Sequence, residues 1–397
     1  EFLKDKGFKE NAFGIMQDLS KVKLVITPNS LKIFKFAKYI DGNTAENVAE
    51  WDKNTWQYWI DNVPTKFGIV KSEHISNYGG GNYNKMSYQM HNSLPIRRTD
   101  VPELLHTDFQ YMKDMKNHVS VFRNYINNSQ YCATAGFIDN MLVNSDKFAQ
   151  MDVFKEYRND TIKNYKTRMK MGKTSVKGDY ATICSMPWEF LNSILHQEPE
   201  DFKKFKETLI PLQDKGEIYC KALNLDERVT IFRSPHICAS NVIVGQNKAH
   251  TEFETWFNFT RGIVVVTPWI WDIMERGNSL DFDSDSCLIV REKKIYERAL
   301  EVQNFATPVH DIPNDPVERH NCMDDLAKLD GLISVNKIGE ICNLAQVLNS
   351  YYWNEYFKDE PDKKVMEEIY NQIIILAILS NIEIDKAKHV FDLDMEE

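Results

Sequence analysis

Three aspartates alternate along the chain just before an apolar run, and this pattern limits what the surrounding chain can fold into. Asp281, Asp283 and Asp285 stand at positions i, i+2 and i+4, and residues 287–290 are apolar. In a tight turn that leads into a strand, three such side chains can converge on one point. Converging carboxylates repel one another unless a cation lies among them, and oxygen-only ligands select a hard ion such as Mg²⁺. The pattern therefore predicts a metal-binding turn for phosphate chemistry.

Other structures are compatible with the same spacing. A calcium loop also begins D-x-D-x-D and ends with Glu at its twelfth position, here Glu292, but its sixth position requires Gly and holds Ser286. A haloacid-dehalogenase-type aspartate pair would follow a hydrophobic strand directly, whereas residues 274–279 intervene here. A solvated acidic turn without a metal is the remaining alternative.

The composition excludes several classes of protein. With 397 residues, 43% of them hydrophobic, the chain can form two or three domains with sizeable cores. Its 16 Gly and 13 Pro are too few for a low-complexity or disordered chain. The longest strongly apolar run, Ile373–Leu379, is too short to span a bilayer, so we expect no membrane partner, and no signal peptide is visible.

The cysteines indicate the redox state of the protein's compartment, and the net charge limits which partners it can bind. The 7 cysteines are scattered without any C-x-x-C, which indicates neither a zinc ribbon nor a disulfide framework and favours a reducing compartment. The net charge of −10 counts modestly against a nucleic-acid binder, although local basic strips do the binding in such proteins. The chain begins without Met, so it is compatible with a piece of a longer protein that has further regions or subunits.

Periodicity predicts a β-rich centre between helical regions. Strands are expected at 22–27 and 67–71 around a helix at 44–60, whose Trp51, Trp56 and Trp59 share one core-facing side. Residues 102–170 read as mostly helical. The central strands are predicted at 176–184, 228–232, 241–244 and 262–267, with helices at 187–195 and 268–276, and further helices at 333–357 and 362–390.

A run of cations follows the first helical region. Such a run is typical of a solvated helix face, and the alternative is a strip that binds a nucleic-acid backbone. Its members are Lys163, Lys166, Arg168, Lys170, Lys173 and Lys177.

The order of elements between residues 173 and 290 resembles the catalytic double-psi β-barrel of the two-barrel RNA polymerases, and is most similar to single-chain phage-type and silencing RNA-dependent members. The acidic turn at 281–285 is similar to the family's D-x-D-G-D loop, with Ser284 where Gly is usual. Residues 232–236, F-R-S-P-H, resemble its R-x-P-x-x-H element, with the histidine one residue early. Further similar segments are the barrel's opening strand at 176–180, its inserted helix at 186–191, the bridge-helix-like segment at 334–343 and a later helix at 384–388.

This resemblance implies an α+β fold with a double-psi β-barrel catalytic core, a second barrel upstream, helical insertions and a C-terminal helical region. It implies four parts: a first, lysine-donating barrel region with a helical lead-in (1–140), a basic helical connector (141–173), the catalytic barrel (174–295) and a helical region (296–397). The cytoplasm of a bacterial or phage-infected cell, or a virion, is the location that the family suggests.

The resemblance also implies a chemistry, namely transcription by template-directed nucleotidyl transfer to an RNA 3′ end. The three aspartates would hold Mg²⁺, or Mn²⁺ in its place, and a second ion would arrive with the nucleoside triphosphate. Arg233 would contact the sugar hydroxyls of the nucleotide, and Lys71 and Lys85 would neutralise phosphate charge. The implied partners are a DNA or RNA template, the RNA product and nucleoside triphosphates.

Two other functions stay open at this point. One is a non-enzymatic module stabilised by calcium or another metal, and the other is a degenerate polymerase-like scaffold. Ser284 bears on the second, because Ser fits the turn only if its backbone avoids positive φ, where Gly is favoured. His236 is expected to be a hydrogen-bonded core histidine, and Arg233 has the alternative of a surface ion pair.

Overall fold

The computed structural model describes residues 5, 7, 16–22, 32–62, 66, 83–128, 132–193, 212, 214–309, 320 and 322–387. They belong to two compact units, the first formed by Glu1–Ser72 with Thr251–Asn258 and the second by Glu73–His250 with Phe259–Glu397. The boundaries predicted after residues 140, 173 and 295 all fall within the second unit, so the four-part division stays a prediction.

The regular elements described in the first unit are helices. Its helix α3 packs against η1, and Phe34 and Trp56 meet edge to face with ring centroids 5.2 Å apart. The expectation that three tryptophans of α3 form a core is wrong, because all three are only half-buried and Thr55 is the buried residue. Strands were predicted at 22–27 and 67–71, and all of their residues except Val22 lie outside the described residues. The elements are η1 (Ile33–Tyr39), η2 (Val48–Glu50), α3 (Trp51–Asn62) and α12 (Thr251–Trp256).

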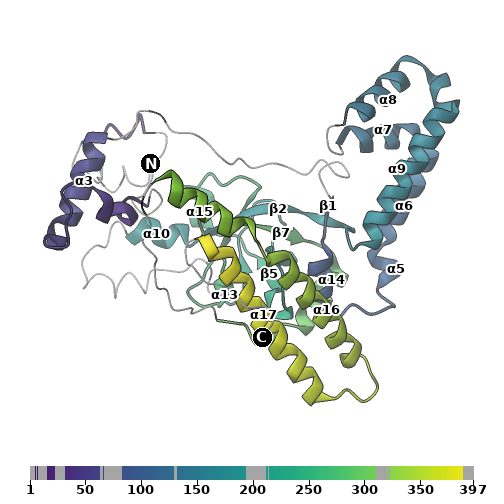
Figure 1. Cartoon of the computed structure of the whole chain (residues 1–397). Helices are drawn as coiled ribbons and strands as arrows, with labels where there is room; N and C mark the ends of the chain where they lie inside the picture. Colours follow the sequence, from purple (N-terminus) through teal and green to yellow (C-terminus); the bar gives the residue numbers. More distant parts are fainter. Residues whose placement is uncertain are drawn as a thin grey trace. The chain divides into compact units, whose positions relative to one another are not determined.

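The second unit begins with a helical region that matches the prediction for residues 102–170. Aromatic and aliphatic side chains from several helices form its core, in which the rings of Phe122 and Phe154 meet edge to face with centroids 5.6 Å apart. Figure 1 shows α6 and α9 side by side. The elements are α4 (Tyr88–Asn92), α5 (Val101–Leu104), α6 (His106–Asn117), α7 (Val119–Asn128), α8 (Ala133–Asn144), η4 (Asp146–Gln150) and α9 (Asp152–Lys170).

One mixed sheet forms the centre of this unit. The predicted strands at 176–184, 228–232 and 262–267 are confirmed, whereas the one at 241–244 begins later because η5 (Ala239–Asn241) precedes it. The helix predicted at 268–276 is reduced to α13 (Ile273–Arg276), and that predicted at 187–195 is α10 (Pro187–Ser193). The strands are β1 (Tyr83–Lys85), β2 (Ser175–Ser185), β3 (Glu217–Ile218), β4 (Arg228–Phe232), β5 (Ile243–Asn247), β6 (Ile263–Val266) and β7 (Ser286–Val290).

The strand pairing returns to its starting point. Neighbours run β1-β2-β7-β4-β5-β3, and β6 pairs in parallel with β2. Tyr219, directly after β3, then forms an antiparallel bridge with Val265 of β6, with N–H···O distances of 3.1 and 2.8 Å in the two directions. Six strands therefore form a closed ring of hydrogen-bonded neighbours, and β1 extends β2 outside it.

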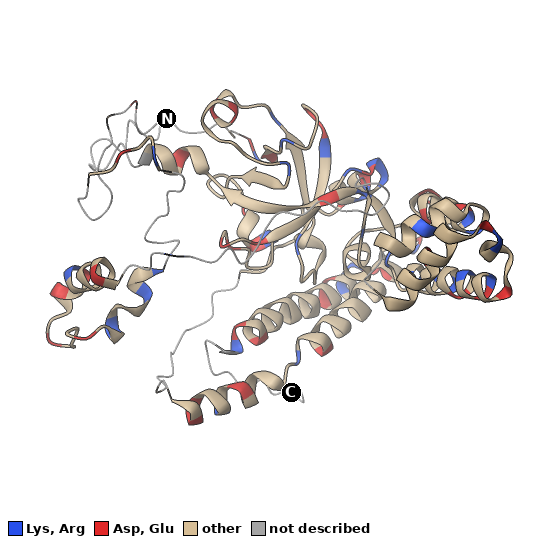
Figure 2. Ribbon diagram, turned by 90° about the horizontal axis from the view of Figure 1, so that it is seen from above, with Lys and Arg blue, Asp and Glu red and all other residues tan. Residues whose placement is uncertain are grey.

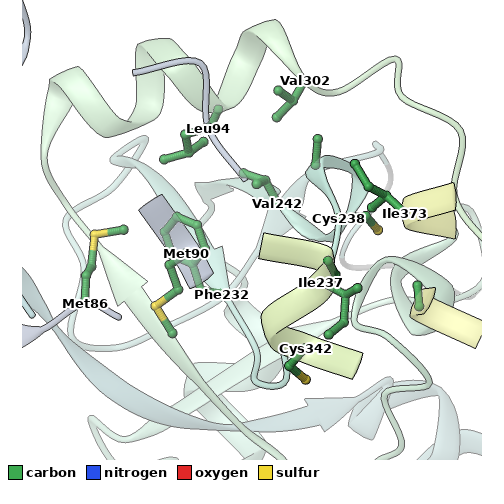
Figure 3. Close-up of a cluster of buried hydrophobic side chains, with 14 of the residues drawn as sticks. Met86, Met90, Leu94, Phe232, Ile237, Cys238, Val242, Val302, Cys342 and Ile373 are labelled. Atoms are coloured by element: carbon green, nitrogen blue, oxygen red, sulfur yellow. The ribbon is translucent and has the colours of Figure 1, made fainter. Parts of the chain in front are cut away.

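Alternation along the strands divides the core into two clusters. On β7, Cys287 and Ile289 belong to the cluster enclosed by the ring of strands, and Leu288 and Val290 belong to the cluster on the other face. Figure 3 shows part of the second cluster, in which Phe232 of β4 lies among side chains from the flanking helices. Strands buried on both faces explain why these segments are continuous apolar runs in the sequence.

Helices cover the outer cluster. They are α14 (Lys293–Glu301), α16 (Ile338–Tyr356) and α17 (Lys363–Ile384); α15 (Met323–Ser334) lies between α14 and α16 in the chain, and η6 (Asp385–Ala387) follows α17. The expectation that no segment could span a bilayer needs correction, because α17 is long and apolar enough by length and composition alone. A core helix meets the same criterion, and α17 packs along α16 and contributes Ile373, Leu376 and Ala377 to the outer cluster.

Candidate metal centre

The acidic turn joins α13 to β7, and local backbone geometry forces it to fold back on itself. A Cβ on Gly277 would overlap Leu280, so this position requires glycine. Asn278 and Ser279 follow in the left-handed region, with φ values of 57° and 58°. Ser284 also has a positive φ, 109°. The condition that Ser284 should avoid positive φ is therefore not met, and the turn has a glycine-type backbone with a serine side chain.

The three aspartates of the turn converge as the sequence predicts. One carboxylate oxygen from each of Asp281, Asp283 and Asp285 lies within 4.8 Å of the others. The backbone N–H of Asp281 donates to Asp285 Oδ2 at 3.2 Å, and that of Asp283 donates to Asp281 Oδ1 at 3.4 Å. Burial, reinforced by the neighbouring Asp283 and Asp285, raises the pKa of Asp281. Three oxygen donors at this spacing fit a hard divalent ion such as Mg²⁺ or Mn²⁺.

Arg233 lies against this cluster. Its Nη2 is 2.9 Å from Asp285 Oδ2, and its Nη1 donates to the carbonyl oxygens of Gly277 and Asn278 at 3.0 and 2.7 Å. The Arg233 side chain is only 15% exposed, so the expected alternative of a surface ion pair does not describe it. The guanidinium therefore both fixes the start of the turn and places a positive charge beside the carboxylates.

Buried polar side chains support the turn through hydrogen bonds. Asn278 is fully buried, and its side chain accepts from Asn381 Nδ2 of α17 at 3.2 Å and donates to the Pro235 carbonyl at 3.4 Å. Arg276, also buried, donates to the carbonyl oxygens of Ser240 and Gln303. The roles of Asn381 and Arg276 are absent from the sequence-based site, because their partners lie far away in the chain and no local motif marks them.

His236 is buried as expected, but its hydrogen bonding differs from the prediction. Neither ring nitrogen has a partner in hydrogen-bonding geometry among the described residues, and the ring stands edge-on to Phe232. Burial lowers the pKa of His236 to about 3, against a smaller opposing effect from the backbone of Arg233. The imidazole is therefore neutral at pH 7 and supplies no charge to the metal centre.

The structure does not bring Lys85 to the aspartates. Its ammonium donates to Asp108 Oδ1, the Tyr165 hydroxyl and Ser175 Oγ at 2.8, 2.9 and 2.8 Å. Burial lowers the pKa of Lys85, partly offset by Asp108. Lys85 pairs with Ser175 at one end of β2, whereas Ile183 N–H donates to the Asp285 carbonyl, roughly 26 Å further along the strand at ~3.3 Å per residue. Lys71 lies outside the described residues.

The six cations of the basic strip are all exposed, and none forms an ion pair with another described residue. Lys163, Lys166 and Lys170 are spaced by three and four residues, so they follow one side of α9. Figure 2 shows both signs of charge along the helices of this region, and on α9 itself the acidic residues precede the strip. The strip is therefore a local feature of the end of α9 and the start of β2, where Arg168, Lys173 and Lys177 complete it.

The calcium-loop alternative does not fit the residues after the turn. They form the strand β7 and not a second helix. Glu292, which would be the twelfth ligand, instead accepts the backbone N–H of Lys177 and lies outside the cluster of three aspartates. The described acidic residues thus form a three-carboxylate site and not an EF-hand loop.

Comparisons with known proteins give distant structural likenesses and no sequence match. No protein family's sequence model matches this chain, and no curated protein matches it. Among solved structures, the RNA dependent RNA polymerase QDE-1 from Thielavia terrestris is similar over 79% of this chain, with 12% identity and a TM-score of 0.47. The aligned part covers 36% of that structure's chain.

Proposed function

We propose that this chain is the catalytic core of a template-directed RNA polymerase, which adds ribonucleotides to an RNA 3′ end on a DNA or RNA template. The observation that supports this best is the convergence of Asp281, Asp283 and Asp285 beside Arg233. Arg233 precedes Asp281 by 48 residues, and both segments were expected from the polymerase motifs. In this proposal the closed ring of six strands is the family's double-psi β-barrel.

The residues of the site would contribute in different ways to an in-line phosphoryl transfer. A divalent cation held by Asp281, Asp283 and Asp285 would supply Lewis-acid stabilisation of the phosphate and the attacking oxygen. The chain itself contributes positioning and electrostatics, which are the main protein contributions to this reaction. Arg233 orients the turn by donating hydrogen bonds to two of its carbonyl oxygens. The guanidinium also forms an ion pair with Asp285, one of the three carboxylates.

Extension of a labelled RNA on separate DNA and RNA templates tests the proposal. Asp283→Asn removes one charge from the cluster without changing its size, and we expect it to lower the rate of incorporation on the order of 100-fold or more, since ion-mediated charge stabilisation is worth several kcal/mol. Asp330→Asn on α15, at an exposed aspartate outside the cluster, is the matched control and should extend RNA at the parental rate. Equal rates for the parent and Asp283→Asn would remove the assignment.

Metal titration separates this proposal from a calcium-stabilised module. Three carboxylates with room for water ligands should bind Mn²⁺ and Mg²⁺ weakly, and Asp283→Asn should weaken that binding. Tighter binding of Ca²⁺ than of Mn²⁺, together with no incorporation on either template, would favour the non-enzymatic module.

A further inference from the structure

A cavity of about 580 Å³ lies in the second unit, away from the acidic turn. Residues of α4, α5, the end of α9 and α16 line it, and most of its wall is aliphatic or aromatic. Leu94, Leu104 and Met169 form part of the aliphatic wall. Nothing in the proposed catalytic site uses this cavity, so its shape and lining need a separate explanation.

Two aromatic side chains give the cavity flat surfaces. Tyr88 stands at the rim, 38% exposed, and its hydroxyl donates to Asn343 Oδ1 at 3.1 Å. Gly172, with φ of 78°, lies so close to Tyr88 that a Cβ there would be 2.7 Å from the Tyr88 Cβ. Trp353 lies deeper, with its indole N–H donated to the Asn92 carbonyl. The Tyr88 ring is thus fixed at both ends and stays partly open to solvent.

The polar groups of the wall are used within the protein. His91 Nε2 and Thr174 Oγ1 lie 2.7 Å apart, and burial lowers the pKa of His91 to about 4, so the ring is neutral at pH 7. Ser350 Oγ donates to the Gln346 carbonyl. The cavity therefore offers flat apolar surfaces and few free hydrogen-bonding groups, which suits an aromatic ring without selecting its edge pattern.

Positive charge is concentrated beside the cavity. Lys170 is part of its lining, Lys166 lies one turn earlier on the same side of α9, and Lys173 follows three residues later. These lysines are exposed and form no ion pair with the described residues, in a chain whose net charge is −10. The occupant should therefore carry negative charge outside the cavity and a flat apolar group inside it.

We propose that this cavity receives an unpaired base of a single-stranded nucleic acid whose phosphates lie along Lys166, Lys170 and Lys173. Stacking platforms beside a positively charged groove are the general means of binding single strands without sequence preference. The inference rests on the proposed function only in taking nucleic acid as the polymer that the chain handles. It adds a second contact with that polymer, separate from the aspartates.

Fluorescence anisotropy of a labelled single-stranded 12-mer, titrated with the full chain at several salt concentrations, tests the proposal. Tyr88→Leu should weaken binding by roughly 5- to 150-fold, the range of one stacked base, whereas Tyr88→Phe keeps the ring and should bind like the parent. Lys170→Gln should lower the slope of log K against log salt by about 0.7. Lys363→Gln on α17, an exposed lysine outside the strip, should leave both quantities unchanged.

An abasic 12-mer of the same length separates base stacking from phosphate binding. With it, Tyr88→Leu and the parent should bind equally, while the effect of Lys170→Gln should remain. Equal binding of the base-containing strand by the parent and by Tyr88→Leu overturns the proposal. The proposal is also overturned if the parent protein does not bind the strand but binds an acidic apolar peptide.

Crosslinking of a 5-iodouridine strand to the parent provides a readout that does not depend on a variant folding. A crosslink mapped to Tyr88 supports the proposal, and crosslinks found only elsewhere overturn it. Failure here is distinguishable from failure of the proposed function, because the latter is read from incorporation by Asp283→Asn and its control. If incorporation requires Asp283 but strand binding does not require Tyr88, the proposed polymerase function stands and the proposed role of the cavity is wrong.

Discussion

Replacing Ser284 by Gly should stabilise the acidic turn. Ser284 has φ of 109°, a region that is nearly restricted to glycine because a Cβ meets the neighbouring backbone there. Holding a residue with a side chain in such a region costs on the order of 1–3 kcal/mol. Gly removes that cost, but it adds roughly 0.5–1 kcal/mol of backbone entropy to the unfolded chain. The net expectation is a free energy of unfolding higher by about 1 kcal/mol.

Two control variants isolate the cause. Ser284→Ala removes the hydroxyl and keeps the Cβ, so it should gain nothing. The difference between the Gly and Ala variants measures the strain at this position minus the entropic cost of Gly. Ser286→Gly makes the same change two residues later, within β7, where the backbone is extended. There the entropic cost of Gly acts alone, and stability should fall by about 0.5–1 kcal/mol.

Denaturant unfolding monitored by tryptophan fluorescence, in buffer without divalent ions, gives the comparison. Equal m-values are required, so that midpoints report stability. The expected order of midpoints is Ser284→Gly, then the parent, then Ser286→Gly. If Ser284→Gly is no more stable than Ser284→Ala, the strain at the positive φ does not exceed the entropic cost of Gly, and the account of the turn is refuted.

Two more predictions concern the residues that support the turn. Arg233→Gln should lower the free energy of unfolding by about 2 kcal/mol without divalent ions, because Asp285 loses a charged partner, and saturating Mn²⁺ should recover part of it in denaturant unfolding. His236→Leu should be less sensitive to acid than the parent. The folded pKa of His236 is about 3, below the ordinary 6.5, so its cost is absent above pH 6.5 and grows as pH falls. The stability difference between variant and parent should shift by about 2 kcal/mol in favour of the variant from pH 7.5 to pH 5, and a constant difference would contradict this.

Short sequence patterns correctly predicted those elements of the fold that are determined by a few neighbouring residues. The strand at 228–232 matched its predicted bounds, because it is buried on both faces and bordered by charged residues. The convergence of the aspartates followed from their spacing and the strand after them. The tryptophans of α3 show the limit of such reasoning: helical spacing placed them on one side, but their burial depends on what packs there.

The contacts that complete the site join distant segments, and no local pattern encodes them. Asn278 meets Asn381 of α17, more than 100 residues later, and both are small polar residues without a motif. Lys85 of β1 forms its ion pair with Asp108 of α6, and the burial of Asp108 makes this pair a part of the packing of α6 against the sheet. A lysine chosen from sequence as a phosphate ligand thus lies in a structural network, because sequence shows its charge and not its neighbours.

The charge balance of the turn connects its folding to its function. Three carboxylate oxygens within 4.8 Å repel one another, and the backbone forces them together through a buried Asn278 and the glycine-type geometry of Ser284. Arg233 contacts the cluster through its ion pair with Asp285. The neighbouring carboxylates of Asp283 and Asp285 raise the pKa of Asp281 in addition to the effect of burial, so repulsion within the cluster persists. A divalent ion would relieve this repulsion. Ion binding would therefore stabilise the folded turn, and folding of the turn and binding of the ion are coupled.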